Sequence, residues 1–394
     1  MSTLRRTIAA LAGSAVVAGL LPTAAAFADD PWPVPGPATI SIDGDGYGHG
    51  KGMSQYGAYG AARKGLNFKQ VLRFYYPGTR FDDLAGRVKV RISADDDRDL
   101  VVDDRRGLTV RNLASGRVWR PDLPKATRWR IRPSGGRNVI SYRTSAWHTW
   151  RTVKGDAELA AGGRPLELRT PDGVVAYRGA LRSTVRNGTR LTVNVLPMES
   201  YVRGVVPAEM YASWPQQALR AQAVASRTYA AYEREHTNNR AFDLCDTAAC
   251  QAYGGFSAES ASSNDAVRAT ARRVLTHQGG TAFAQFSASN GGWTVAGQFP
   301  YLPAQEDPYE GSSTDYYGWT ATVSDTDIED AYNIEDLESI SITARDGQGG
   351  RGGRVETVEL ASTTGWRGTV TGESFRSHFG LRSTMFEISD VQPR

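Results

Sequence analysis

The sequence predicts an α+β fold, in which a strand-rich N-terminal half packs with a helical segment in a single unit. Short alternating stretches recur over residues 86–180, as between Val88 and Ile92, and this alternation is typical of half-buried strands. Helical spacing begins near residue 198 and is clearest from Ala218 to Tyr232. A content of 40% hydrophobic and 22% charged residues indicates a globular protein rather than a disordered or polytopic membrane chain.

Residues 1–28 are predicted to be a secretory signal peptide. Arg5 and Arg6 precede a near-apolar stretch, and Ala26-Phe27-Ala28 fits the small-x-small cleavage rule. Removing this segment takes away two arginines and no acidic residue, which lowers the formal net charge from +4 to +2. We therefore expect a secreted protein of the extracellular cell wall, with no transmembrane segment in the mature chain. The nearly balanced charge argues against a nucleic-acid partner.

The mature chain is expected to have three further parts. Residues 29–38 form a proline-rich leader, residues 39–80 a glycine-rich loop followed by a helix-like segment, and residues 81–394 the main domain. Four helices are predicted in the main domain: 198–206, a helix from 213–215 to 232, 266–276 and 371–379. In the second, Ser213 is expected to be the N-cap and Pro215 a residue of the first turn, and the third is expected to be capped near Ser263 or Asn264.

Glu209 is the leading candidate for a catalytic residue. It lies in Val205-Val206-Pro207-Ala208-Glu209-Met210, just before a predicted helix. Apolar neighbours raise the pKa of a carboxyl group, and a general acid requires a raised pKa. Glu199, in contrast, is expected to pair with Arg203 on the next helical turn.

Two glycine-containing loops are candidate parts of a binding site. In Gly46–Ala58, His49, Ser54 and Gln55 offer hydrogen bonds to a polar ligand, whereas the alternative is a tight packing loop with a buried histidine. In the second loop, the candidate residues are Ser287, Ser289, Asn290 and Gly291. That loop is either a polar turn or a substrate-lining loop, and hydroxyl and amide groups beside a tryptophan suit sugars.

The two cysteines allow two interpretations. Cys245 and Cys250 are separated by four residues, which permits a local disulfide in an oxidising compartment. They also permit a metal clip, with His236 as a third ligand. Because there is one nearby histidine and no second cysteine pair, a closed zinc site is disfavoured, and no cofactor is expected.

Together these segments resemble the stage II sporulation protein D family, SpoIID/LytB. The strongest match is VNVLPMESYVRGVVPAEMYASWPQQALRAQAVASRTYAAY at residues 193–232, followed by CDTAACQAYGG, FSASNGGWT and PYLPAQEDPYE in the family's order. GYGHGKGMSQYGAYGAARKG, from residue 46, resembles a motif that usually ends the family's domain. Its N-terminal position suggests a circular permutation, which predicts that His49 packs near Glu209 and Asn290. Residues 46–56 placed far from both would contradict it.

The resemblance implies a lytic transglycosylase that cuts glycan strands between N-acetylmuramic acid and N-acetylglucosamine and forms a 1,6-anhydro sugar. Glu209 matches the family's catalytic glutamate. Some members bind zinc near the cysteines, but Ala248-Ala249 stand here where a histidine is common. One alternative is a non-enzymatic LytB-like module that binds the wall and activates a cell-wall amidase. Another is ordinary hydrolysis by Glu209 together with Asp243 or Asp246.

Overall fold

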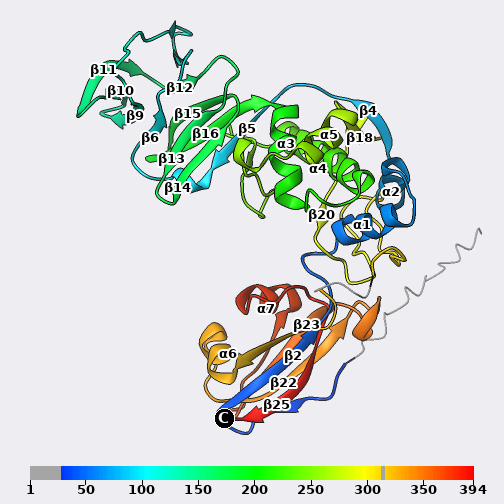
Figure 1. The fold of residues 1–394 in the computed structure, drawn as a ribbon. Helices are drawn as coiled ribbons and strands as arrows, with labels where there is room; N and C mark the ends of the chain where they lie inside the picture. Colours follow the sequence, from blue (N-terminus) through cyan, green and yellow to red (C-terminus); the bar gives the residue numbers. More distant parts are fainter. Residues whose placement is uncertain (1–27, 312–315) are drawn as a thin grey trace, which may run out of the picture.

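A computed structural model describes residues 28–311 and 316–394 of the chain. The predicted signal peptide lies outside the described residues, except for Ala28. The described chain contains several sheets and helices, which confirms the α+β class (Figure 1). None of the described helices is long and apolar enough to cross a membrane.

Two sheets form the strand-rich part of the molecule. The first has the order β17-β5-β16-β15-β12-β7-β8 and the second β11-β10-β9-β6-β13-β14. The strands of the first are β5 (Arg87–Ile92), β7 (Thr109–Asn112), β8 (Val118–Trp119), β12 (Ala157–Ala160), β15 (Ala180–Arg186), β16 (Thr189–Pro197) and β17 (Leu244–Cys245). Those of the second are β6 (Leu100–Asp103), β9 (Arg128–Ser134), β10 (Arg137–Arg143), β11 (Trp147–Lys154), β13 (Leu166–Thr170) and β14 (Gly173–Tyr177). The alternation between Val88 and Ile92 lies on β5, whose apolar residues are all buried, as predicted.

Helix α4 lies at the centre of the helical part, because it contacts four other helices. These helices are α1 (Gln55–Arg63), α2 (Phe68–Tyr75), α3 (Met198–Glu209), α4 (Gln216–His236) and α5 (Ala261–Ala269). All residues from Ala218 to Thr228 except Arg220 are buried, since small alanine side chains let neighbours approach from several sides. Pro215, rather than Ser213, occupies the N-cap position of α4. The short strands here are β3 (Met53–Ser54), β4 (Arg80–Asp83), β18 (Arg273–His277), β19 (Gly280–Thr281) and β20 (Phe286–Ser287).

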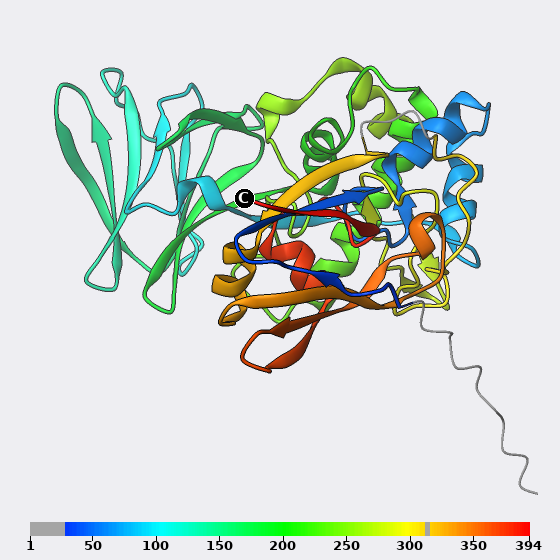
Figure 2. The same cartoon turned by 90° about the horizontal axis from the view of Figure 1, so that it is seen from below.

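The C-terminal residues form a second unit with its own core (Figures 1 and 2). One sheet has the order β1-β22-β23-β24 and the other β21-β2-β25. The strands and helices are β1 (Trp32–Pro33), β2 (Ala38–Gly44), β21 (Trp319–Ser324), α6 (Asp325–Tyr332), β22 (Leu337–Arg345), β23 (Val355–Ser362), β24 (Arg367–Thr371), α7 (Gly372–His378) and β25 (Phe386–Pro393). Strand β2 completes its sheet from the N-terminal side of the chain, and its Ala38, Ile40 and Ile42 are fully buried.

The two cores divide the chain differently from the expected parts, which were residues 39–80 and 81–394. The larger core joins apolar residues from Met53 to Leu302, whereas the smaller one joins Val34–Ile42 with Trp319–Ile388. Residues 45–52 therefore connect the two cores rather than belonging to a separate unit. The leader also takes part in the fold, because Trp32 and Pro33 pair with β22.

The helix expected over residues 266–276 is wrong in its bounds. Helix α5 begins earlier, because Ser260 Oγ accepts a hydrogen bond from the backbone N–H of Ser263 at 3.2 Å. The chain then turns at Arg272, whose φ is +66°. Residues 273–277 form β18, which pairs antiparallel with β4.

Glu199 does not pair with Arg203 as expected. Its carboxylate accepts hydrogen bonds from Arg227 of α4, at 2.8 Å from Nε and 2.9 Å from Nη2, and from the backbone N–H of Arg272. Arg227 is fully buried, so its charge requires this partner. The pair fixes α3 against α4, and Glu209 is the last residue of α3.

Candidate active site

The glycine-rich segment 46–54 lies beside the second candidate loop. Tyr47 forms a β-bridge with Ser289, and β3 pairs in parallel with β20. Gly52 has a φ of +68°, and a Cβ there would lie 2.0 Å from the carbonyl oxygen of Gln285, so a larger residue does not fit. The expected placement of residues 46–56 beside the 285–291 loop is therefore confirmed.

Ser54 and Gln55 begin α1 and point to two different carboxyl groups. Ser54 is the N-cap: its Oγ accepts from the backbone N–H of Gly57 at 3.0 Å and donates to Glu310 Oε2. The amide Nε2 of Gln55 donates to Glu209 Oε2 at 3.0 Å. Two consecutive residues thus link the start of α1 to Glu310 on one side and to Glu209 on the other.

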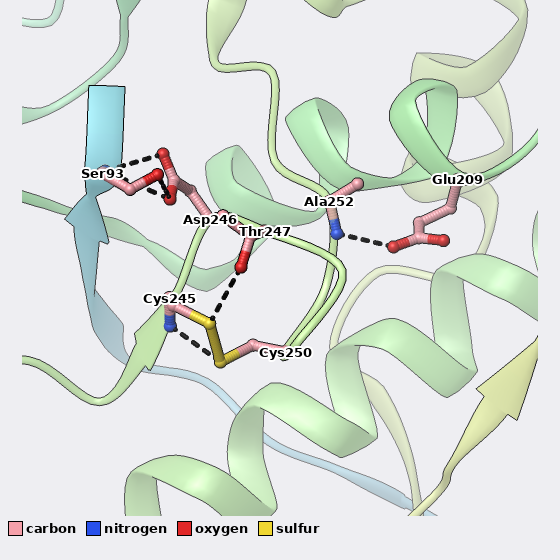
Figure 3. The surroundings of a disulfide bond; sticks show 7 residues. All are labelled: Ser93, Glu209, Cys245, Asp246, Thr247, Cys250 and Ala252. Carbon is pink, nitrogen blue, oxygen red and sulfur yellow. Dashed lines mark hydrogen bonds between the residues drawn. A yellow bond between two sulfur atoms is a disulfide. The ribbon is translucent and has the colours of Figure 1, made fainter. Parts of the chain in front are cut away.

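Glu209 is half-buried at the C-terminal end of α3, and both its oxygens accept hydrogen bonds. The backbone N–H of Ala252 donates to Oε1 at 2.6 Å, as Figure 3 shows. Burial raises the pKa of the Glu209 carboxyl above its ordinary value, whereas the hydrogen bonds from Ala252 and Gln55 lower it by less. The group is therefore held in one orientation, while burial moves its titration to higher pH than that of an exposed glutamate.

Cys245 and Cys250 form a disulfide, with their Cα atoms 5.6 Å apart. The bond closes the loop that leads to Ala252, whose N–H faces Glu209 (Figure 3). Both sulfurs are used in this bond, and His236 Nδ1 lies 2.8 Å from the carbonyl oxygen of Tyr232. A zinc site built from Cys245, Cys250 and His236 does not fit this arrangement, because zinc binds free thiolates.

A cavity of about 470 Å³ opens beside Glu209. It is lined by parts of segments 47–55, 208–209, 248–250 and 285–288, together with Tyr229 of α4. The walls thus come from the two glycine-containing loops, the disulfide loop and the end of α3. Among the described lining residues, Glu209 is the only one with a carboxyl group.

The predicted binding residues fall into two groups. His49, Gln55 and Ser287 line the cavity with Glu209. The other predicted residues, namely Ser54, Ser289, Asn290 and Gly291, are buried behind its wall. Their hydrogen bonds hold the two glycine-containing loops together. These residues therefore affect ligand binding indirectly, through the shape of the loops.

His49 is neutral in this setting. Its Nδ1 accepts a hydrogen bond from the backbone N–H of Lys51 at 2.9 Å, which leaves the proton on Nε2. His49 is an exposed residue that lines the cavity. Desolvation by the surrounding atoms, and next the positive charges of Lys51 and Arg354, lower its pKa to about 4. At neutral pH the imidazole is thus a hydrogen-bonding group and not a cation.

Two carboxyl groups behind the cavity were missed by the sequence reasoning. Asp307 Oδ2 accepts from Tyr75 Oη at 2.6 Å and from Asn290 Nδ2 at 2.7 Å. Glu310 accepts from Ser54 and from the backbone N–H of Asn290. Burial raises the pKa of Glu310 to about 7. In the sequence, both residues could have been noticed as acidic residues among the prolines and tyrosines of 300–310.

Asp243 and Asp246 are engaged away from Glu209. Asp243 forms an ion pair with Lys89 Nζ at 3.0 Å and accepts from the backbone N–H of Lys89. Asp246 accepts from Ser93 Oγ at 2.7 Å, on the opposite side of the disulfide loop from Glu209 in Figure 3. Neither aspartate lines the cavity.

A half-buried carboxyl group in a cavity with mixed polar and apolar walls defines a candidate acid–base site, and known proteins give matches to one family. Residues 186–277, which include α3 and α4, match the family model of the stage II sporulation protein SpoIID. Stage II sporulation protein D of Bacillus subtilis is 26% identical over 251 residues, which cover 58% of this chain and 68% of that protein. These matches confirm the expected resemblance to the SpoIID family.

Two other relatives match over shorter stretches. An uncharacterized protein of Brachyspira hyodysenteriae is 38% identical over 135 residues, which cover 32% of this chain and 37% of that protein. The amidase enhancer of Bacillus subtilis is 34% identical over 171 residues, which cover 42% of this chain and 22% of that protein. The chain thus spans well under two thirds of the length of either.

Proposed function

We propose that the protein is a secreted lytic transglycosylase that cleaves peptidoglycan glycan strands. The observation that carries the proposal is Glu209, held by two hydrogen bonds at the cavity with its pKa raised by burial. A protonated carboxyl group can donate to an oxygen that leaves as an alcohol. The relationship to SpoIID proteins supports a substrate in the bacterial cell wall.

The reaction uses Glu209 first as an acid and then as a base. The Glu209 proton passes to the glycosidic oxygen as the bond from C1 of the muramic acid breaks. The carboxylate then takes the proton of the C6 hydroxyl, whose oxygen bonds to C1. The products are a 1,6-anhydro end and a strand that ends in a free hydroxyl group, and no water is consumed.

The cavity favours this route over hydrolysis. Most glycosidases need a second carboxylate, which acts as nucleophile or activates water. Glu209 is the only carboxyl group among the described lining residues, and Asp243 and Asp246 are bound elsewhere. An intramolecular hydroxyl group removes the need for a second carboxylate. No metal or other cofactor takes part in the proposed reaction.

Substitution of Glu209 tests the proposal. Glu209→Gln keeps the shape and removes the transferable proton, so release of anhydro ends from peptide-free glycan strands should fall by at least about a hundredfold. The matched control is Glu235→Gln, at the exposed end of α4. The thermal unfolding midpoints of both variants should stay within a few degrees of the wild type. Undiminished release by Glu209→Gln would refute the proposal.

A second candidate function is activation of a cell-wall amidase, because one relative is named an amidase enhancer. In that case the cavity would bind glycan without cutting it. Purified protein that binds strands, yields no anhydro ends and accelerates an amidase would select this function. The same Glu209→Gln variant would then stimulate the amidase as well as the wild type does.

A further inference from the structure

Five aromatic rings form a continuous row beside the cavity. Neighbouring ring centroids lie 5.1 Å apart for Tyr47 and Tyr316 and 5.0 Å for Tyr316 and Tyr56. They lie 4.9 Å apart for Tyr56 and Trp214 and 5.6 Å for Trp214 and Tyr211. These residues, called the aromatic row below, come from the glycine-rich loop, α1, the α3–α4 connection and the segment before β21.

Both ends of the aromatic row lie close to Glu209. Tyr47 lines the same cavity as Glu209, and Tyr211 follows Glu209 by two residues. The two end residues are also the most exposed, at 44% for Tyr47 and 63% for Tyr211. Rings that served only to pack the core would be buried, so an exposed row that begins at a cavity-lining ring, Tyr47, indicates a binding surface.

Positive charges flank the aromatic row on two sides. The guanidinium of Arg382 lies 5.7 Å from the ring centroid of Tyr316. Arg63 lies 5.7 Å from the ring centroid of Tyr59, which is itself 4.9 Å from that of Trp214. Flat rings suit the C–H faces of sugars, and guanidinium groups suit carboxylates. The combination therefore fits a sugar chain that carries acidic substituents.

We propose that the aromatic row is a second binding region that holds a glycan chain outside the cavity, with muramic acid carboxylates near the flanking arginines. This inference rests on the proposed function, because it extends the same substrate beyond the cleaved bond. A strand held along the row would contact the protein at Tyr47, which lines the cavity with Glu209, and at Tyr211, two residues after Glu209. Longer strands should therefore bind more tightly than short ones.

Binding measurements on the full mature chain test the proposal. Tyr47→Ala and Tyr211→Ala are titrated with peptide-free glycan strands of six or more sugars and with the neutral N-acetylglucosamine hexamer. We expect each variant to lose about tenfold in affinity for both probes. Arg63→Gln should weaken binding of the muramic acid strands several-fold and leave the neutral hexamer unchanged. The control is Trp366→Ala, which removes an aromatic ring of equal exposure, 44%, beside β24.

Three results would overturn the inference. One is affinity within twofold of the wild type in both tyrosine variants, and another is an equal loss in Trp366→Ala. The third is intact glycan binding with lost amidase stimulation, which would make the aromatic row a protein-docking surface. Glycan binding is measured separately from cleavage of the glycosidic bond. If wild-type protein released no anhydro ends while Tyr211→Ala still lost glycan binding, the proposed reaction would fail and the aromatic row would stand.

Discussion

At the residue scale, the state of Glu209 results from opposing effects on its pKa. Burial favours the neutral acid, while Gln55 and the N–H of Ala252 favour the carboxylate. Burial dominates, so the acid form persists to higher pH than for an exposed glutamate. The neutral His49 adds no titrating group near pH 6.5, because its pKa is about 4.

Gln55→Leu should move the pH dependence of the reaction. Removing the Nε2 donor takes away a contribution that lowers the pKa of Glu209, so the descending limb of kcat/KM should shift to higher pH. The rate should also fall by roughly tenfold, since the carboxyl group loses one of its two positioning bonds. The control is Gln392→Leu on the exposed end of β25, and an unmoved or lowered limb contradicts this role.

Glu310 should make the protein less stable as the pH rises. Its folded pKa of about 7 exceeds the unfolded value near 4.5, so the native state binds more protons between these values. Stability therefore declines from about pH 4.5 to pH 7. Glu310→Gln should remove that decline and raise the free energy of unfolding at pH 8 by about 3 kcal/mol. Denaturant titrations at pH 5 and pH 8 measure this, with the exposed Glu306→Gln as control, and an unchanged pH slope would count against it.

At the element scale, the disulfide loop supports the catalytic group without touching a ligand's reacting atoms. Cys245 and Cys250 close the loop before Ala252, whose N–H holds Glu209. The same loop is anchored through Asp246 to Ser93, the residue that follows β5. The geometry at Glu209 therefore depends on a covalent link and on a strand of the first sheet.

Replacing both cysteines by serine should lower the free energy of unfolding by about 2 kcal/mol, the value expected for so short a closed loop. The value of kcat should fall more than KM rises, because Ala252 would position the acid less well. Reduction of the wild type with a thiol should reproduce both effects. Full activity after verified reduction would show that the loop holds its shape without the bond.

The elements also show what local sequence can predict. The strand alternation at Val88–Ile92 and the alanine-rich face of α4 were predicted correctly, because both patterns report burial directly. The helix end near Ala269 was missed, since it depends on a turn at Arg272 and on pairing with the distant β4. Asp307 and Glu310 were missed for a similar reason: their burial comes from contacts with α1, α2 and the 285–291 loop.

At the scale of the whole molecule, the chain ends explain how the glycine-rich motif can stand at the N-terminus. Ala38 of β2 pairs with Pro393 of β25, and the backbone N–H of Arg394 donates to the carbonyl oxygen of Pro37 at 2.7 Å. A short turn could join these ends. The segment would then follow β25, which is the order expected from the family resemblance.

A circular permutant tests this relationship. Residue 394 is joined to residue 37 by a short glycine-containing linker, and the chain is opened at Pro77-Gly78, an exposed turn with open space around Gly78. The permutant should fold with a stability within about 1 kcal/mol of a linear chain that begins at residue 37, which also lacks the pairing of Trp32 and Pro33 with β22, and should keep the activity of that chain. Spectroscopy and denaturant unfolding measure the fold. Opening the chain instead inside the buried β2 is the control expected to abolish folding.

The central claim is that Glu209 cuts a glycan strand without consuming water. The most direct measurement is mass spectrometry of the products formed from peptide-free strands in water enriched in ¹⁸O. We predict ends one water lighter than hydrolysis products, with no ¹⁸O incorporated and none formed by Glu209→Gln. Ends that carry ¹⁸O would show hydrolysis and contradict the claim.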